Sequence, residues 1–139
     1  MLCDELYSFY RKSVSDFERD FQEVFGENLV LKDKCCSFEH RGYFKLHYVY
    51  VPLNYAIIVE NEFRTFGIVI EDEEKAMTSL YRIEHFENQL SEGNIIKSIK
   101  LLEKVLSENK FDLFLHIAGK TYRKNKNGLK RVKDIKELM

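Results

Sequence analysis

The chain has 139 residues, and its 23 acidic side chains nearly balance its 22 Lys and Arg, giving a formal net charge of −1 although 32% of the residues are charged. Apolar residues make up 45% and aromatic residues 14%, with a single Pro, which excludes disordered, collagen-like and low-complexity proteins. A chain of this length buries about two-thirds of its unfolded surface, so we expect one domain over residues 1–139 whose core needs no disulfide bonds or metal ions for stability.

The N-terminus and the cysteines predict a cytoplasmic protein. Asp4 and Glu5 stand where a secretory signal needs positive charge followed by an apolar stretch. The longest uninterrupted apolar run, residues 55–59, is far shorter than the roughly 20 residues that span a bilayer. Three cysteines, two of them adjacent, make a poor disulfide framework. We therefore expect a soluble protein in a reducing cytoplasm, without membrane contact.

The first stretch of the chain has the period of an amphipathic helix. Between Asp4 and Phe25, apolar side chains recur at steps of three and four residues and charges fill the other face. The apolar stripe consists of Leu6, Phe9, Tyr10, Val14, Phe17, Phe21, Val24 and Phe25. Asp4 is the expected N-cap, and Gly26 the residue that ends the helix. The alternative is a break near Ser13 or Ser15, either of which could cap a second helix.

The middle of the chain changes to a period of two, which is typical of strands. In residues 43–50 the aromatic and apolar even-numbered positions share one face, and Pro52 ends this strand. Two shorter β-prone runs follow at residues 56–59 and 66–70, with residues 60–62 as the expected turn region. Short connections imply antiparallel neighbours, because a parallel pair needs a crossover of a dozen residues or more. The middle of the chain is therefore predicted to be a β-meander.

After Glu71 the period returns to that of helices. One predicted helix carries Ala76, Leu80, Ile83 and Leu90 on its apolar face, and a second carries Ile96, Ile99, Leu102, Val105 and Leu106. Residues 91–94 separate the two, and residues 111–118 alternate again as a fourth strand. The predicted fold class is α+β, an antiparallel β-meander packed with about three amphipathic helices, with a long helix at the N-terminus.

The C-terminal segment fits two structures. Residues 121–124 and 129–132 could form a hairpin across Asn125-Lys126-Asn127-Gly128. Alternatively, a terminal helix could carry Leu129, Val132, Ile135 and Leu138 on one face. The sequence leaves this choice open.

Short motifs identify no catalytic residue, cofactor or metal site. Gly119-Lys120-Thr121 matches the end of a phosphate-binding loop, but that loop needs a Gly where Phe114 stands. None of the four histidines lies four residues from another on a predicted helix, and the chain has no C-x-x-C pair. We therefore expect a protein that is not an enzyme and that holds no cofactor.

A partial match to metal-dependent nucleases gives one enzyme alternative. Glu73 and Lys75, with Glu60 or Glu62 upstream, resemble the arrangement in which two carboxylates hold a divalent cation and a lysine steadies developing charge. In such nucleases the E-x-K element lies on a strand, whereas residues 71–74 precede a helical pattern, where acids favour the first turn of a helix. A small nuclease that uses Glu62, Glu73 and Lys75 is the alternative function.

The near-neutral total hides two opposed blocks of charge. Residues 60–92 contain nine acids and three bases, net −6, whereas residues 120–139 contain eight bases and two acids, net +6. Charge runs usually do no more than solvate a surface, and the two blocks could also face each other. A dense acidic block can instead steer a basic protein surface, such as a nuclease cleft built to hold phosphate. The candidate partner-binding residues are Glu60, Glu62, Glu71, Asp72, Glu73, Glu74, Glu84 and Glu87.

The overall layout resembles the immunity proteins of bacterial contact-dependent growth inhibition and related polymorphic-toxin systems. The features that carry the resemblance are the amphipathic helix that ends at Phe25, the meander from Tyr43 to Ile70, and the acids at residues 71–74. The resemblance implies stoichiometric, non-catalytic binding to one cognate toxin domain, often a nuclease. It also implies that a sheet edge could accept a strand or hairpin of the toxin.

Nucleic acid is a less favoured partner. The basic C-terminal block suits a nucleic-acid-binding regulator, with Tyr122 as one stacking residue. One aromatic ring is a poor platform, however, and a chain with net charge −1 is far from the basic character expected of such proteins. The sequence therefore favours a protein partner.

Overall fold

The computed structural model describes the backbone of residues 2–133 and the side chains of residues 7–133, and its fold is α+β. Within these residues the helices are α1 (Leu2–Phe25), α2 (Leu80–Ile83) and α3 (Glu92–Glu108), with a short 3₁₀ helix at Gly26–Asn28. The strands are β1 (Leu29–Ser37), β2 (Tyr43–Tyr50), β3 (Tyr55–Glu62), β4 (Thr65–Glu71), β5 (Met77–Ser79), β6 (Leu113–Ile117), β7 (Lys120–Asn125) and β8 (Gly128–Arg131).

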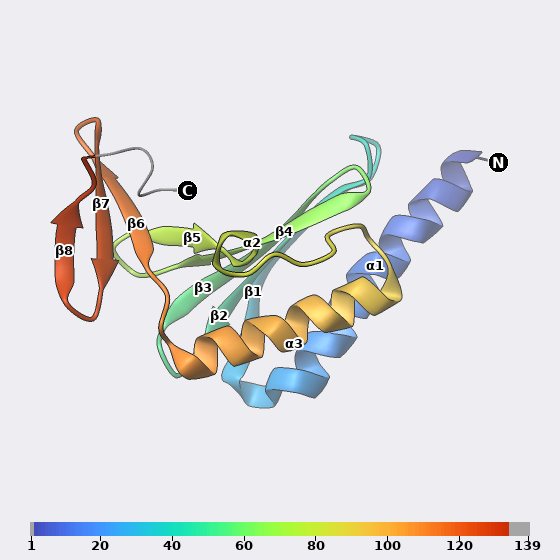
Figure 1. Cartoon of the computed structure of the whole chain (residues 1–139). Coiled ribbons are helices and arrows are strands. Elements are labelled where there is room, and N and C mark those ends of the chain that lie inside the picture. Colours follow the sequence, from blue (N-terminus) through green and yellow to red (C-terminus); the bar gives the residue numbers. More distant parts are fainter. Residues whose placement is uncertain (1, 134–139) are drawn as a thin grey trace.

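The eight strands lie in chain order within one antiparallel sheet, so the predicted meander is confirmed and extends beyond residues 43–70. Strands β1 to β5 form the main sheet. After α2 and α3, the chain returns to the sheet through a single residue pair between β5 and β6, Met77 with Phe114. Strands β6 to β8 therefore form a three-stranded unit beside the main sheet, at the left of Figure 1, which we call the β6–β8 unit.

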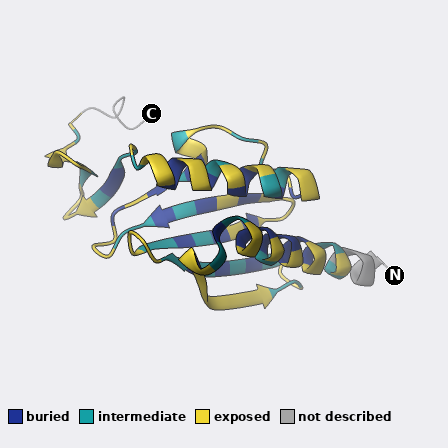
Figure 2. Cartoon of the chain, turned by 90° about the horizontal axis from the view of Figure 1, so that it is seen from below, coloured by how far each residue is buried: buried dark blue, intermediate teal, exposed yellow. Residues whose placement is uncertain are grey.

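Both long helices cover the same face of the main sheet (Figure 2). The ring of Phe17 in α1 lies 6.0 Å from that of Phe44 in β2, and the ring of Phe21 lies 4.6 Å from that of Tyr48. The even-numbered positions of β2 thus face the core as predicted. The N-terminal helix is also confirmed, as one unbroken helix that Gly26 ends at φ +55°. Asp4 is not its N-cap as predicted, because the helix already begins at Leu2.

The predicted turn at residues 60–62 is wrong. β3 continues to Glu62 and pairs there with Thr65, so the turn falls after it. The cause is Asn61, which is only 6% exposed and still forms three hydrogen bonds to backbone groups of neighbouring strands and turns. A polar residue with all these partners can stand inside a strand at a buried position.

The predicted helix through residues 76–90 is wrong except for one turn. Met77–Ser79 is β5, α2 covers only Leu80–Ile83, and Gln89 forms a bridge to Thr65 of β4. Pairing with β4 decides this, because the backbone groups along that edge need partners and β5 and residue 89 supply them. Three of the four apolar residues that marked the predicted helix are buried all the same.

The structure also tests the predictions for the C-terminal part of the chain, as far as its residues are described. α3 and β6 lie where a helix and a strand were expected. Of the two C-terminal alternatives the structure has the hairpin, in which Leu129 lies in β8 and pairs with Lys124. Ile135 and Leu138, which the helix alternative required, lie outside the described residues. No helix of the described part is both long and apolar enough to cross a membrane.

Candidate binding surfaces

The face of the main sheet that points away from α1 and α3, here named the outer face, has an apolar centre. Side chains alternate along each strand, so the neighbours of the buried residues point to this side. The centre consists of Val49, Ala56, Ile58 and Val69, with Val30 and Met77, 40% and 41% exposed, at the two edges. Apolar side chains thus continue across five neighbouring strands on a face that neither long helix covers.

Polar side chains surround this centre, and most of them are acidic. The rim consists of Asp33, Lys45, His47, Glu60, Glu62 and Glu71. Tyr43 donates a hydrogen bond of 2.8 Å to the Glu60 carboxylate. Burial, and secondly this bond, raise the pKa of Tyr43 to about 12. Four carboxylates against one lysine make the rim of the outer face acidic.

The structure does not gather the eight predicted partner-binding acids into one patch. Glu60, Glu62 and Glu71 lie on the rim of the outer face, Asp72, Glu73 and Glu74 lie between β4 and β5, and Glu84 and Glu87 lie between α2 and α3. Glu84 is 3.9 Å from Lys104, and both side chains are exposed, so this ion pair is weak. Only the first three acids share a surface with an apolar centre.

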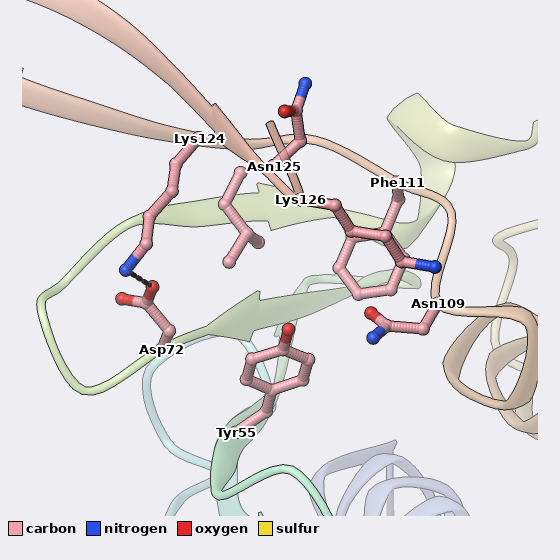
Figure 3. Close-up of a pocket in the computed structure, with 8 residues that line it drawn as sticks. Tyr55, Asp72, Asn109, Phe111, Lys124, Asn125 and Lys126 are labelled. Atoms are coloured by element: carbon pink, nitrogen blue, oxygen red, sulfur yellow. Dashed lines mark hydrogen bonds and ion pairs between the residues drawn. The ribbon is translucent and has the colours of Figure 1, made fainter. Parts of the chain in front are cut away.

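Asp72 joins the segment between β4 and β5 to the β6–β8 unit (Figure 3). Its Oδ2 accepts a hydrogen bond of 2.6 Å from Nζ of Lys124, and its Oδ1 accepts from the backbone N–H groups of Glu74 and Ala76 at 2.9 and 3.0 Å. The bond to Asp72, and then that to Glu74, raise the pKa of Lys124. The two charge blocks therefore neutralise each other here, and the Asp72 side chain, 9% exposed, is not free for a partner.

A cavity of about 290 Å³ lies beside this ion pair (Figure 3). Tyr55 and Phe111 contribute aromatic rings whose centroids are 6.0 Å apart, and burial raises the pKa of Tyr55. The volume is at the lower end of the range for small-molecule sites, and two of the polar groups around it, Asp72 and Lys124, already bind each other. We therefore interpret the cavity as a gap where the main sheet meets the β6–β8 unit, and not as a small-molecule site.

The residues of the nuclease alternative do not form one site. Glu62 precedes β4 whereas Glu73 and Lys75 follow it, so the seven residues of β4, about 20 Å of strand, separate them. Lys75 instead lies 3.6 Å from Glu71. Among the described residues no three Asp, Glu, His or Cys side chains are placed to hold a metal ion.

The β6–β8 unit carries only basic charge. Residues 113–133 contain no Asp or Glu, and their bases are Lys120, Arg123, Lys124, Lys126, Lys130, Arg131 and Lys133. The Gly119-Lys120-Thr121 motif lies here, but it is not a phosphate-binding loop: Gly119, at φ +77°, lies in the turn between β6 and β7, and Lys120 and Thr121 begin β7. The sequence indicated Tyr122 as an aromatic residue among these bases. The structure shows that the unit also exposes two apolar side chains, Ile117 and Leu129, which are 47% and 52% exposed.

Comparisons with models of protein families, with curated proteins and with solved structures find no match to this chain. The candidate surfaces therefore rest on the chemistry of the chain itself. They are the outer face with its acidic rim and the basic β6–β8 unit.

Proposed function

We propose that the protein is a non-catalytic binding protein that neutralises a cognate bacterial toxin domain by stoichiometric occlusion, in the manner of the immunity proteins that its layout resembles. The observation that supports this function best is the outer face, with apolar side chains at its centre and charged side chains around them. Specific protein interfaces have this anatomy, since water is excluded from the centre while the rim stays hydrated.

The charge of the rim favours a basic partner. Glu60, Glu62 and Glu71 lie on it with Asp33, and Lys45 is the one lysine among them. A nuclease domain, whose cleft must attract phosphate, presents the complementary charge. In this proposal the protein acts in the cytoplasm of the toxin-producing cell, where it covers the cleft before the nuclease reaches nucleic acid.

The first experiment is co-expression with the toxin encoded immediately upstream. A stable complex and protection from growth arrest are expected, and the absence of both would contradict the proposed function. Ile58→Asp places an uncompensated charge at the apolar centre of the outer face and should weaken the complex by 100-fold or more, or about 3 kcal/mol. Leu129→Asp makes the same kind of change at a residue of β8 that is 52% exposed and lies outside the main sheet, and should leave binding unchanged.

Charge reversal tests the rim separately. Glu60→Lys with Glu62→Lys should lower the association rate at low salt by tenfold or more, with a smaller change in dissociation, because rim charges act on the diffusional encounter. Glu103→Lys on the exposed side of α3 is the matched control. Asp72 is unsuitable for this test, since it holds Lys124. An association rate that does not respond to the pair would place the interface elsewhere.

A further inference from the structure

The β6–β8 unit presents basic charge, and only part of it is paired with the described acids. Lys124 is paired with Asp72 and Glu74 of the main sheet. Within residues 7–133, by contrast, no carboxylate forms an ion pair with Lys120 or Arg131. The unit stands at the side of the main sheet (Figure 1), and Lys120 and Arg131 are both exposed. A cationic surface of this kind attracts a polyanion.

The pairing of the strands surrounds one aromatic ring with cations. Tyr122 lies between Leu115 of β6 and Arg131 of β8 in the same cross-strand row. Lys120 and Lys124 are two positions away on β7, so they point to the same side as Tyr122. Arg131 is therefore about 5 Å from Tyr122 across the sheet, and each lysine is about 7 Å away along the strand, between Cα atoms.

Apolar side chains extend the same surface. Ile117 precedes the hairpin turn and pairs with Lys120, while Leu129 pairs with Lys124, and both side chains are about half exposed. By register and alternation both share the side of Tyr122. This side of the unit thus combines a ring, aliphatic surface and the exposed cations Lys120 and Arg131, which suits a ligand with both flat faces and negative charge.

We propose that this surface, which we name the Tyr122 face, binds single-stranded nucleic acid. An unpaired base stacks on the Tyr122 ring, and Lys120 and Arg131 contact the phosphates on either side of it. Stacking on aromatic rings and a cationic track for the backbone are the two elements with which proteins bind single strands without sequence preference. A duplex is a poorer ligand, because its bases are stacked on each other and cannot reach the ring.

The near-neutral charge of the whole chain does not oppose this assignment. The net charge of −1 averages the acidic rim of the main sheet with the β6–β8 unit. The two lie on different parts of the fold, and screening at physiological salt limits each to about 8 Å. A ligand at the Tyr122 face therefore experiences the local charge. Binding here does not depend on the proposed toxin interface, and Ile58→Asp should leave it unchanged.

Fluorescence anisotropy with a fluorescein-labelled 20-nucleotide oligo(U) tests the proposal, using the full chain between 50 and 300 mM NaCl. We expect a Kd on the order of 1–100 µM at the lowest salt, weakening steeply as salt rises. A duplex of the same length should bind more weakly. No binding of the single strand at 50 mM NaCl would overturn the proposal, and so would sedimentation with phosphatidylserine vesicles in place of oligonucleotide binding.

Two sets of variants separate stacking from charge. Tyr122→Ala should weaken binding about 5- to 100-fold without changing the salt slope, whereas Tyr122→Phe should keep the affinity of the wild type. The double variant Lys120→Ala, Arg131→Ala should reduce the slope of log K against log salt by about 1.4, or 0.7 for each lost contact. The matched control is Lys97→Ala with Lys100→Ala on α3, two exposed lysines. An equal loss in this control would show that binding is not at the Tyr122 face.

Discussion

Replacing Asp72 tests whether the main sheet and the β6–β8 unit are held together by one carboxylate. The side chain is 9% exposed and accepts three hydrogen bonds, one from Lys124 and two from the backbone N–H groups of Glu74 and Ala76. Asp72→Ala removes all three acceptors. Hydrogen bonds to charged groups contribute about 1.5–3 kcal/mol each, and the exposure of Lys124 lowers its share.

We therefore expect Asp72→Ala to lower the free energy of unfolding by about 3–4 kcal/mol, a large part of the 5–15 kcal/mol typical of a domain. Asp72→Asn keeps an oxygen for the two N–H groups and loses only the charge toward Lys124, so it should lower the free energy of unfolding by about 1 kcal/mol. Lys124→Met should cost about the same, and the double variant less than the sum of the two. Glu73→Ala, next to Asp72 but exposed, should change stability by less than about 0.5 kcal/mol.

Urea unfolding at pH 7, followed by far-ultraviolet circular dichroism because the chain has no Trp, measures these differences. Hydrogen exchange adds a local readout: amides of β6 and β7 should exchange faster in Asp72→Ala than those of β2 and β3, since a single residue pair otherwise connects β5 to β6. The reasoning fails if Asp72→Asn costs as much as Asp72→Ala, or if Glu73→Ala matches either of them.

Three further substitutions test the opposite end of the sheet. Gly42→Ala should cost about 3 kcal/mol or more, because its φ is +77° and a Cβ there would lie 2.0 Å from the Tyr10 ring; a fall in Tm under about 3 °C would contradict this. Asn61→Ala should cost about 3 kcal/mol in urea unfolding, since it leaves three backbone groups without their partner, and a loss under 1 kcal/mol would refute that. The pKa of Tyr43 is about 12 in the folded protein against 10.0 in the unfolded chain, so its neutral phenol stabilises the fold below pH 10, and this stabilisation is lost as pH rises toward 12. The stability difference between wild type and Tyr43→Phe should therefore shrink between pH 8 and 11.5 and not stay constant.

Elements with one buried and one hydrated face were predictable from the sequence. α1 is an example, because Phe17 and Phe21 recur at helical spacing and both reach the core. β2 is another, since its even-numbered residues contact the helices while Lys45 and His47 face outward. In both elements local periodicity and burial agree, so the pattern along the chain determines the structure.

Elements that exist because of their neighbours were not predictable in this way. β1 is exposed along almost its whole length, and a bulge between Leu31 and Asp33 breaks its alternation, so no period marks it. Its hydrogen bonds to β2 create it, and these are not encoded in the local pattern. The same holds for β5, where the edge of β4 takes precedence over the helical spacing of Ala76, Leu80 and Ile83.

The candidate sites were likewise predictable only in part. Summing charge by segment located the acids and bases, but it could not show that Asp72 is buried against Lys124 while Glu60 stays on an open face. The spacing of Lys120, Tyr122 and Lys124 was visible in the sequence, yet its meaning depends on the secondary structure. On a helix, residues two apart point in nearly opposite directions, whereas on a strand they share a face. The sequence left open whether residues from Leu129 onward form a helix or the second strand of a hairpin, and only the hairpin places Arg131 beside Tyr122.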